Sequence, residues 1–235
     1  MSVNFEMPEM VPSSVNREGK FDIEGAIEDS KKILASCRFK YDSTFKDTSI
    51  RETVYGGLGT CKTVVLVREA CWYHYLFPDR PIVANIPINL PNFIALTSAK
   101  MLFSIDFPCF LGLDEGWQLA DSRKRGLLID IMNMFMLRSR KRKWWVVLTE
   151  QWYTQVDLRI RFITDVFCEP KYYSLKHKVK VPCYTKHGYR FHRYRFDPRP
   201  IMNFFDTEAD PLTLDVKELE EEYNRYMERK KRFGY

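Results

Sequence analysis

The chain has little glycine, 10 residues in 235, and it lacks several features that mark other classes of protein. No run of eighteen or more apolar residues occurs, which excludes an ordinary transmembrane helix. Residues 1–20 lack the basic start and apolar core of a signal peptide. We therefore expect a soluble, intracellular protein. Its length and 45% hydrophobic content are sufficient for one large core, and no internal repeat suggests a second.

The cysteines also lack a pattern. The six residues at positions 37, 61, 71, 109, 168 and 183 show no short paired spacing. This spacing favours neither a zinc site nor a disulfide scaffold. We expect several of them to lie in the core as small apolar residues.

Three of the ten glycines cluster in one short segment, which is Gly56, Gly57, Leu58, Gly59, Thr60, Cys61, Lys62 and Thr63. The segment matches the phosphate-binding (Walker A) template of Gly, four free positions, Gly, Lys and Ser or Thr, except that Cys61 replaces the last glycine. Backbone N–H groups would face the phosphates, Lys62 would reach the outer ones, and Thr63 would ligate magnesium. The segment predicts a site for ATP and Mg²⁺. The competing interpretation is a Gly-rich turn that merely precedes a helix.

Two later segments supply polar groups for the same chemistry. The apolar run 109–113 followed by Asp114 and Glu115 predicts a buried strand with a Walker B acidic pair at its carboxyl end, where open α/β sheets bind ligands. Asp114 would hold magnesium, and Glu115 would orient and deprotonate the attacking water. A run from residue 144 ends at Gln151, which would lie near the γ-phosphate; Gln155 is the weaker candidate. The alternatives are a helix-capping acidic pair and a surface Gln151.

Strand and helix patterns alternate along the chain and predict an α/β fold with a parallel sheet covered on both faces. The helix 122–142 would present Leu127, Leu128, Ile131, Met134 and Phe135 to the core. We expect a leader and helix over 1–45, a P-loop ATPase domain over 46–210 and a C-terminal helix within 211–235. The other predicted elements are helices 23–36, 62–76 and 216–232 and strands 53–55, 82–90 and 109–113. Asp215 would cap the last helix, and its apolar stripe would pack on the same domain through Val216, Leu219, Tyr223 and Met227.

Residues 171–199 hold nine Lys or Arg and one acid, in a chain whose formal net charge is +6. Alternation in 176–181 and 189–196 predicts a β-hairpin with its turn near 186–188. Cations between aromatic residues suit the backbone of a nucleic acid. The predicted DNA-binding residues are Lys176, Lys178, Lys180, Arg190, Arg193 and Arg195. The competing interpretation is a solvated edge hairpin whose lysines prevent aggregation.

The order of these motifs resembles the HerA/FtsK superfamily of DNA-pumping ATPases, and most of all its zonula occludens toxin-like and viral genome-packaging branches. The basic helix end at 138–141, the segment 82–87 and the segment 205–208 agree with that order, so the resemblance covers roughly residues 50 to 210. It implies a RecA-like P-loop fold and a ring, commonly a hexamer, in which a neighbour's arginine completes each site. Arg138 and Arg140 are the best candidates for that arginine.

The resemblance further implies ATP-driven movement of double-stranded DNA into a virus capsid, with capsid or portal-vertex proteins as partners, in the host cytoplasm or the virion. Two alternatives stay open: a membrane-associated phage assembly ATPase, and a nucleotide- and DNA-binding protein that does not hydrolyse ATP. Cys61 departs from the family pattern and favours the second. Its place at a helix N-terminus beside Lys62 predicts a lowered thiol pKa and a reactive side chain.

Overall fold

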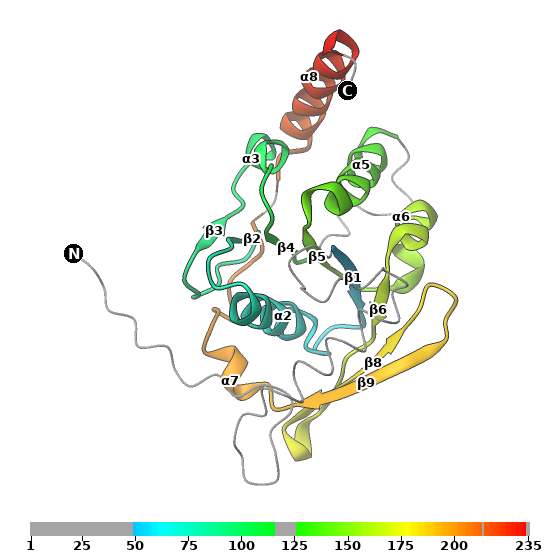
Figure 1. Ribbon diagram of the computed structural model, residues 1–235. Coiled ribbons are helices and arrows are strands. Elements are labelled where there is room, and N and C mark those ends of the chain that lie inside the picture. The colour runs from blue at the N-terminus through cyan, green and yellow to red at the C-terminus, as the bar shows by residue number, and fades with distance from the viewer. Residues whose placement is uncertain (1–48, 116–125, 213, 234–235) are drawn as a thin grey trace, which may run out of the picture.

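The computed structural model describes residues 49–115, 126–212 and 214–233. The predicted segment 1–45, with its helix 23–36, lies outside the described residues. Where the chain is described, helices cover both faces of one nine-stranded sheet (Figure 1). This arrangement confirms the predicted α/β fold class.

Six strands form the parallel part of the sheet, in the order β3-β2-β4-β5-β1-β6. Their bounds are β1 (Ile50–Tyr55), β2 (Ile82–Ala84), β3 (Phe93–Ala95), β4 (Phe110–Leu113), β5 (Trp145–Glu150) and β6 (Val166–Cys168). An antiparallel extension follows from β7 (Lys171–Tyr173), β8 (Lys178–Tyr184) and β9 (Arg190–Phe196). The last two strands are the predicted hairpin.

The helices divide between the two faces. One apolar cluster joins α2 (Lys62–Leu76) and α7 (Arg199–Met202) to the sheet. The cluster on the other face joins α3 (Ala99–Ser104), α5 (Leu127–Arg142), α6 (Leu158–Ile163) and α8 (Val216–Phe233). Short 3₁₀ helices cover Tyr153–Gln155 and Ser174–Lys176. None of the described helices is both long and apolar enough to cross a membrane.

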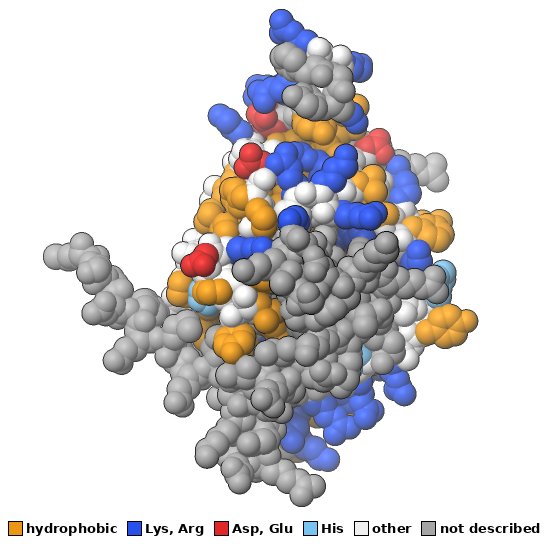
Figure 2. Space-filling model, viewed as in Figure 1, with side chains coloured by type: hydrophobic (Ala, Val, Ile, Leu, Met, Phe, Trp, Pro, Cys, Tyr) orange, Lys and Arg blue, Asp and Glu red, His pale blue; other side chains and the backbone are white. Residues whose placement is uncertain are grey.

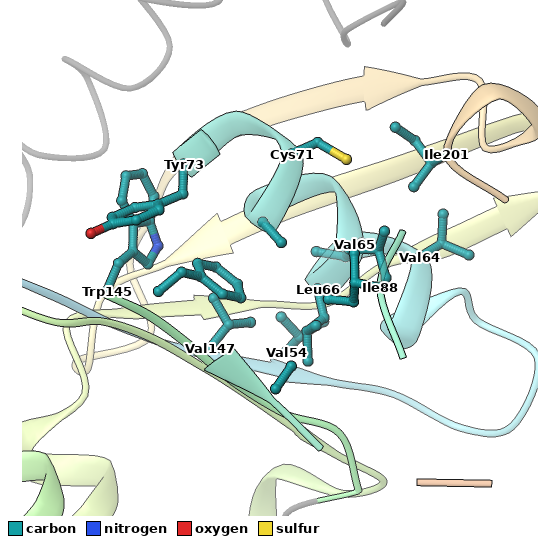
Figure 3. Close-up of a cluster of buried hydrophobic side chains, with 14 of the residues drawn as sticks. Val54, Val64, Val65, Leu66, Cys71, Tyr73, Ile88, Trp145, Val147 and Ile201 are labelled. Carbon is teal, nitrogen blue, oxygen red and sulfur yellow. The ribbon is translucent and has the colours of Figure 1, made fainter. Parts of the chain in front are cut away.

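Alternate side chains of the central strands enter the two clusters. Val54 and Val147 face α2, and Figure 3 shows them opposite Val65 and Leu66 of that helix. A Cβ on Gly112 would lie only 3.0 Å from Leu66 Cδ2, so this glycine lets α2 lie close to β4. Burial on both faces explains why these strands read as continuous apolar runs.

The hairpin is fastened to α2. Its inner face contributes Val179, Val181, Tyr194 and Phe196 to the cluster under this helix. Arg68 of α2 is paired with Glu69 and lies 4.2 Å from the Tyr194 ring centroid. The Tyr194 hydroxyl donates to Glu69 Oε1 at 3.2 Å. The hairpin therefore packs on the helix that follows the Gly-rich turn.

Several predicted elements agree with the structure and others do not. Helix 62–76 is confirmed, and the buried positions of Cys71, Cys109, Cys168 and Cys183 confirm that cysteines lie in the core. The predicted strand 82–90 is wrong beyond Ala84: Asn85 N still donates to Gly112 O of β4 at 3.3 Å, but the chain bends at residues 85–86 and Asn85 O accepts from Leu212 N instead of from a strand. The predicted start of helix 122–142 lies outside the described residues, and its described part begins at Leu127.

The C-terminal helix is confirmed with its cap, since Asp215 Oδ1 accepts a hydrogen bond from Lys217 N at 2.7 Å. Leu219 is fully buried and Tyr223 packs beside it against the domain. Val216 departs from the predicted stripe because 39% of its surface is exposed. Helix α8 therefore packs on its own domain. It contacts α3 and α5, and Leu219 and Tyr223 in the middle of the stripe join the core.

Candidate functional site

The Gly-rich turn connects β1 to α2. Gly56 N donates to Glu150 O of the neighbouring strand at 3.1 Å. A Cβ on Gly56 would lie 2.7 Å from Thr60 Oγ1, so a larger residue at this position would force the Thr60 side chain to move. Thr60 Oγ1 and Lys62 Nζ both donate to Gly57 O, at 2.9 and 3.0 Å. The turn thus folds around the carbonyl group of Gly57, and the ammonium group of Lys62 lies inside the turn.

Cys61 caps α2 in a left-handed backbone conformation, with φ 68° and ψ 36°. Glycine adopts this region freely, whereas an L-residue with a Cβ is strained there by about 1–2 kcal/mol. The template therefore has glycine at this position for a backbone reason. The half-buried thiol has a raised pKa, because the loss of solvation outweighs the nearby charge of Lys62. The predicted lowering of its pKa is wrong.

Replacing Cys61 by glycine should stabilise the protein. We expect Cys61→Gly to raise the free energy of unfolding by about 1 kcal/mol, because it removes the strain, and to keep or raise ATP hydrolysis. Denaturant unfolding measures the first effect. Cys61→Ala is the matched control, since it removes the thiol and keeps the strained Cβ. Equal stabilisation by both variants would show that the backbone is not the cause.

The predicted magnesium ligands are neighbours in space although they are 51 residues apart. Thr63 Oγ1 donates to Asp114 Oδ2 at 2.9 Å, and Thr149 Oγ1 donates to Asp114 Oδ1 at 2.6 Å. Asp114 is buried, which raises its carboxyl pKa, while the two hydroxyl hydrogen bonds lower it. A carboxylate and a hydroxyl suit Mg²⁺, which in phosphate sites is completed by the substrate's own oxygens. The described residues contain no group of three or more His, Cys, Asp or Glu that could hold a metal ion.

Glu115 follows in an unusual conformation. Its φ is 51°, and its N–H donates to Thr149 Oγ1 at 2.8 Å. Thr149 therefore binds both the Asp114 carboxylate and the Glu115 backbone. A glutamate in the left-handed region is strained, and strain of this kind is found mostly where function requires one orientation. This geometry sets the Glu115 side chain, which is partly exposed, beside the buried Asp114.

Asn85 holds the backbone of Asp114. Its Nδ2 donates to Asp114 O at 2.9 Å, and its Oδ1 accepts from Asp114 N at 2.7 Å. Leu212 N donates to Asn85 O at 2.6 Å, which ties the chain leading to α8 to the site. The sequence analysis missed Asn85 and Thr149. Both are polar residues at or just after the carboxyl end of a parallel strand, the signal that identified Asp114.

Removing the Thr149 hydroxyl should disturb the Asp114 carboxylate and the Glu115 backbone at once. We expect Thr149→Val to lower kcat for ATP hydrolysis by about 10- to 100-fold with a smaller change in KM, because a hydrogen bond to a charged group contributes about 1.5–3 kcal/mol. Steady-state kinetics measures this split. Thr149→Ser keeps the hydroxyl and should stay within a few fold of the parent. An equal loss in both variants would assign Thr149 to packing alone.

The order of strands places Gln151 at the same edge of the sheet. β5 lies between β1, which enters the Gly-rich turn, and β4, which ends at the acidic pair. Glu150 pairs with Tyr55, so Gln151 is level with the start of the turn. Gln155 belongs to the following 3₁₀ helix, farther along the chain from this edge. The structure thus brings Gln151 to the predicted site, and its role there stays a prediction.

Arg138 and Arg140 lie elsewhere. They belong to the last turns of α5, which leads to Trp145 at the start of β5, and Trp145 pairs with the first residues of β1 and β4. The two arginines are therefore at the opposite edge of the sheet from the chain's own Gly-rich turn. The Arg138 guanidinium lies 4.9 Å from the Tyr226 ring centroid, and burial lowers its pKa. Their role in a neighbour's site stays a prediction.

A β-bulge determines which side chains of the basic hairpin share a face. Lys180 pairs with Arg195 and Pro182 with Arg193, but the register shifts between Cys183 and Tyr184 so that Tyr184 pairs with Arg190. Strict alternation would turn Arg190 toward the inner face with Tyr194. The extra residue in β9 instead brings it to the outer face with Arg193 and Arg195.

The other predicted cations share this outer face, which we call the basic face. Lys178 is opposite Tyr173, and Lys180 is opposite Lys171 and Arg195. A groove of about 170 Å³ is lined by Tyr173, Lys176, Lys178, Lys180 and Arg195. Figure 2 shows Lys and Arg side chains gathered at the lower edge of the molecule, where Figure 1 places the hairpin. All six predicted DNA-binding residues therefore belong to one surface.

No protein-family model and no curated protein matches the chain. Solved structures resemble it at low identity. One is the N-terminal domain of zonular occludens toxin from Neisseria meningitidis, with 16% identity, a TM-score of 0.46, and coverage of 72% of this chain and 96% of that one. Another is the genome packaging NTPase B204 from Sulfolobus turreted icosahedral virus 2 in complex with ATP-gammaS, with 9% identity, a TM-score of 0.43, and coverage of 64% and 97%.

Proposed function

We propose that this protein is a P-loop ATPase that binds Mg-ATP at residues 56–63 and hydrolyses it. The observation that carries the proposal is the hydrogen-bonded group formed by Thr63, Asp114, Thr149 and the Glu115 backbone beside Lys62. A site that only bound phosphate would need the turn and Lys62. Hydrolysis requires a base in addition, and Glu115, whose strained backbone is held by Thr149, supplies a carboxylate for it.

Each residue has a distinct task in this proposal. The γ-phosphoryl group of ATP would be the electrophile that water attacks. The site would accommodate the negative charge of the phosphates together with the positive charge of Mg²⁺. Lys62 would exchange its bond to Gly57 O for the outer phosphates; burial lowers its pKa, and the carboxylates of Asp114 and Glu115 oppose that shift. Thr63 and Asp114 would hold the metal. Glu115 would accept the proton of the attacking water, and Gln151 would help to orient that water.

We further propose that hydrolysis drives the movement of double-stranded DNA, with viral genome packaging as its setting. The basic face supports the DNA contact, because its six cations can bind successive phosphates. The contacts of Arg68 and Glu69 with Tyr194 support the coupling, since they join α2, which begins at the nucleotide site, to the hairpin. We propose a hexameric ring, completed at each site by Arg138 or Arg140 of a neighbour and docked on capsid or portal-vertex proteins.

A second candidate is a nucleotide- and DNA-binding protein that does not hydrolyse ATP. The strained Cys61 favours it, because its Cβ occupies the place where the template has a bare glycine backbone.

ATP hydrolysis measured with and without double-stranded DNA, together with binding of a fluorescent ATP analogue, separates these candidates. The proposed motor predicts hydrolysis that DNA stimulates several fold. Binding without hydrolysis under both conditions would support the second candidate. Stimulation by lipid vesicles and not by DNA would favour the membrane-associated phage assembly ATPase.

A further inference from the structure

Two cysteine side chains meet at the junction between the basic hairpin and the parallel part of the sheet, where Figure 1 shows β8 beside β6. Cys168 is the last residue of β6 and pairs with Cys183 of the antiparallel strand β8. Their Sγ atoms lie 3.4 Å apart, and both residues are buried, with at most 1% of their surface exposed. The two positions are 15 residues apart in the chain, so the pair becomes visible only through the register of the strands.

The backbone of this pair has the geometry that a disulfide bond requires. Glu169 N donates to Pro182 O at 3.2 Å. Because these two residues directly follow Cys168 and directly precede Cys183, the cysteines form a non-hydrogen-bonded pair, in which the Cα atoms are about 4.5 Å apart. Disulfide bonds span Cα separations of about 4.4 to 6.8 Å. The backbone therefore needs no rearrangement for a bond to form.

The side chains are also directed toward each other. Both belong to the apolar cluster under α2, so they lie on the same face of the sheet. Their sulfur atoms must approach by about 1.4 Å to reach the length of a disulfide bond, about 2.05 Å. A small rotation of the two side chains provides this approach.

The junction depends on a short stretch of pairing. β6 pairs with β8 through two residue pairs, whereas β8 and β9 are joined through six. Local opening of so short a ladder exposes the thiols to small molecules in solution. In the closed state, burial raises the pKa of the Cys168 thiol well above its usual range, so the reactive thiolate is scarce. A bond formed in the open state would be enclosed in the core when the hairpin closes.

We propose that Cys168 and Cys183 form a disulfide bond by exchange with a low-molecular-weight disulfide. The thiolate of one cysteine attacks a sulfur of that disulfide and releases one small thiol. The thiolate of the other then attacks the protein sulfur of the mixed disulfide and releases the second small thiol. The protein thiols lose two electrons and two protons, and the small disulfide is reduced to two thiols. The bond would tie β8 to β6, and it depends neither on ATP hydrolysis nor on DNA binding.

Mass spectrometry of the full chain tests the proposal. Native protein and protein refolded from urea are each equilibrated with oxidised and reduced glutathione, and remaining thiols are then blocked with N-ethylmaleimide under denaturing conditions. After digestion without reductant, we expect the peptides of Cys168 and Cys183 to be linked in both samples, more slowly in the native one. The buried Cys71 and Cys109 are internal controls and should carry N-ethylmaleimide. Separate Cys168 and Cys183 peptides in the refolded sample, or linkage of either to another cysteine, would overturn the proposal.

Thermal unfolding provides a second readout. The bond would join residues 15 positions apart and so restrict the unfolded chain, and the oxidised protein should have a Tm about 6–12 °C above that of the protein reduced with dithiothreitol. Cys183→Ala should have the same Tm after both treatments. Cys71→Ala, which removes a buried thiol of α2 and keeps the pair, should show the full difference. An oxidised parent with the Tm of the reduced one would show that no such bond holds the hairpin.

Discussion

Glu115→Gln is expected to bind Mg-ATP normally and to hydrolyse it about 10²- to 10⁴-fold more slowly than the parent, which is the usual range for the loss of a general base. Glutamine has nearly the same shape and keeps the backbone bond to Thr149, whereas its amide cannot accept the proton of water. The variant should therefore trap ATP. Single-turnover hydrolysis and equilibrium binding of a labelled nucleotide measure the two effects separately.

Lys62→Ala is expected to weaken nucleotide binding itself, which distinguishes the role of Lys62 from that of Glu115. Lys62 Nζ lies inside the Gly-rich turn, so its loss removes positive charge where the outer phosphates would bind. Nucleotide affinity should fall together with the rate. Glu228→Gln on the exposed part of α8 is the control for the loss of one negative charge and should change neither property. Parent-like hydrolysis by Glu115→Gln would exclude Glu115 as the base.

Local spacing in the sequence was sufficient to predict the elements around the proposed nucleotide site. A Gly-rich turn needs only consecutive residues, and Asp114 follows its strand directly. Parallel strands also end at a common edge, and the Gly-rich turn leads from that edge into α2. The fold class and the turn together therefore predict that Thr63 and Asp114, which are joined by a hydrogen bond of 2.9 Å, lie close to each other. The mostly parallel sheet was predictable for the same reason, since buried strands have a continuous apolar pattern.

Features that depend on contacts between distant segments were not predictable. Asn85 lay within a strand predicted to continue to residue 90, and its two hydrogen bonds to the Asp114 backbone become visible only when β2 and β4 are paired. The pKa of the Cys61 thiol depends on burial, which the sequence does not show. Helices α3 and α6 have six residues each, too few for a helical period to be recognised.

The bulge in β9 gives the DNA prediction its structural basis. Period-two alternation predicts only that Arg193 and Arg195 share a face, whereas the register shift adds Arg190 to them. Replacing all three by glutamine should therefore remove three phosphate contacts from one surface. The plot of log affinity against log salt concentration should become less steep by about 2.7, which is about 0.9 for each lost contact.

This change in slope corresponds to a large effect on binding at low salt. Between 50 and 200 mM salt, a slope that is less steep by about 2.7 makes the affinity of the variant fall about 40-fold less than that of the parent. Fluorescence anisotropy with double-stranded DNA of unrelated sequences measures it, and the loss should be uniform across those sequences because phosphates carry no base information. Arg229, Lys230 and Lys231 of α8, replaced together by glutamine, control for the net charge. An equal fall in slope for this control would locate the DNA contacts outside the basic face.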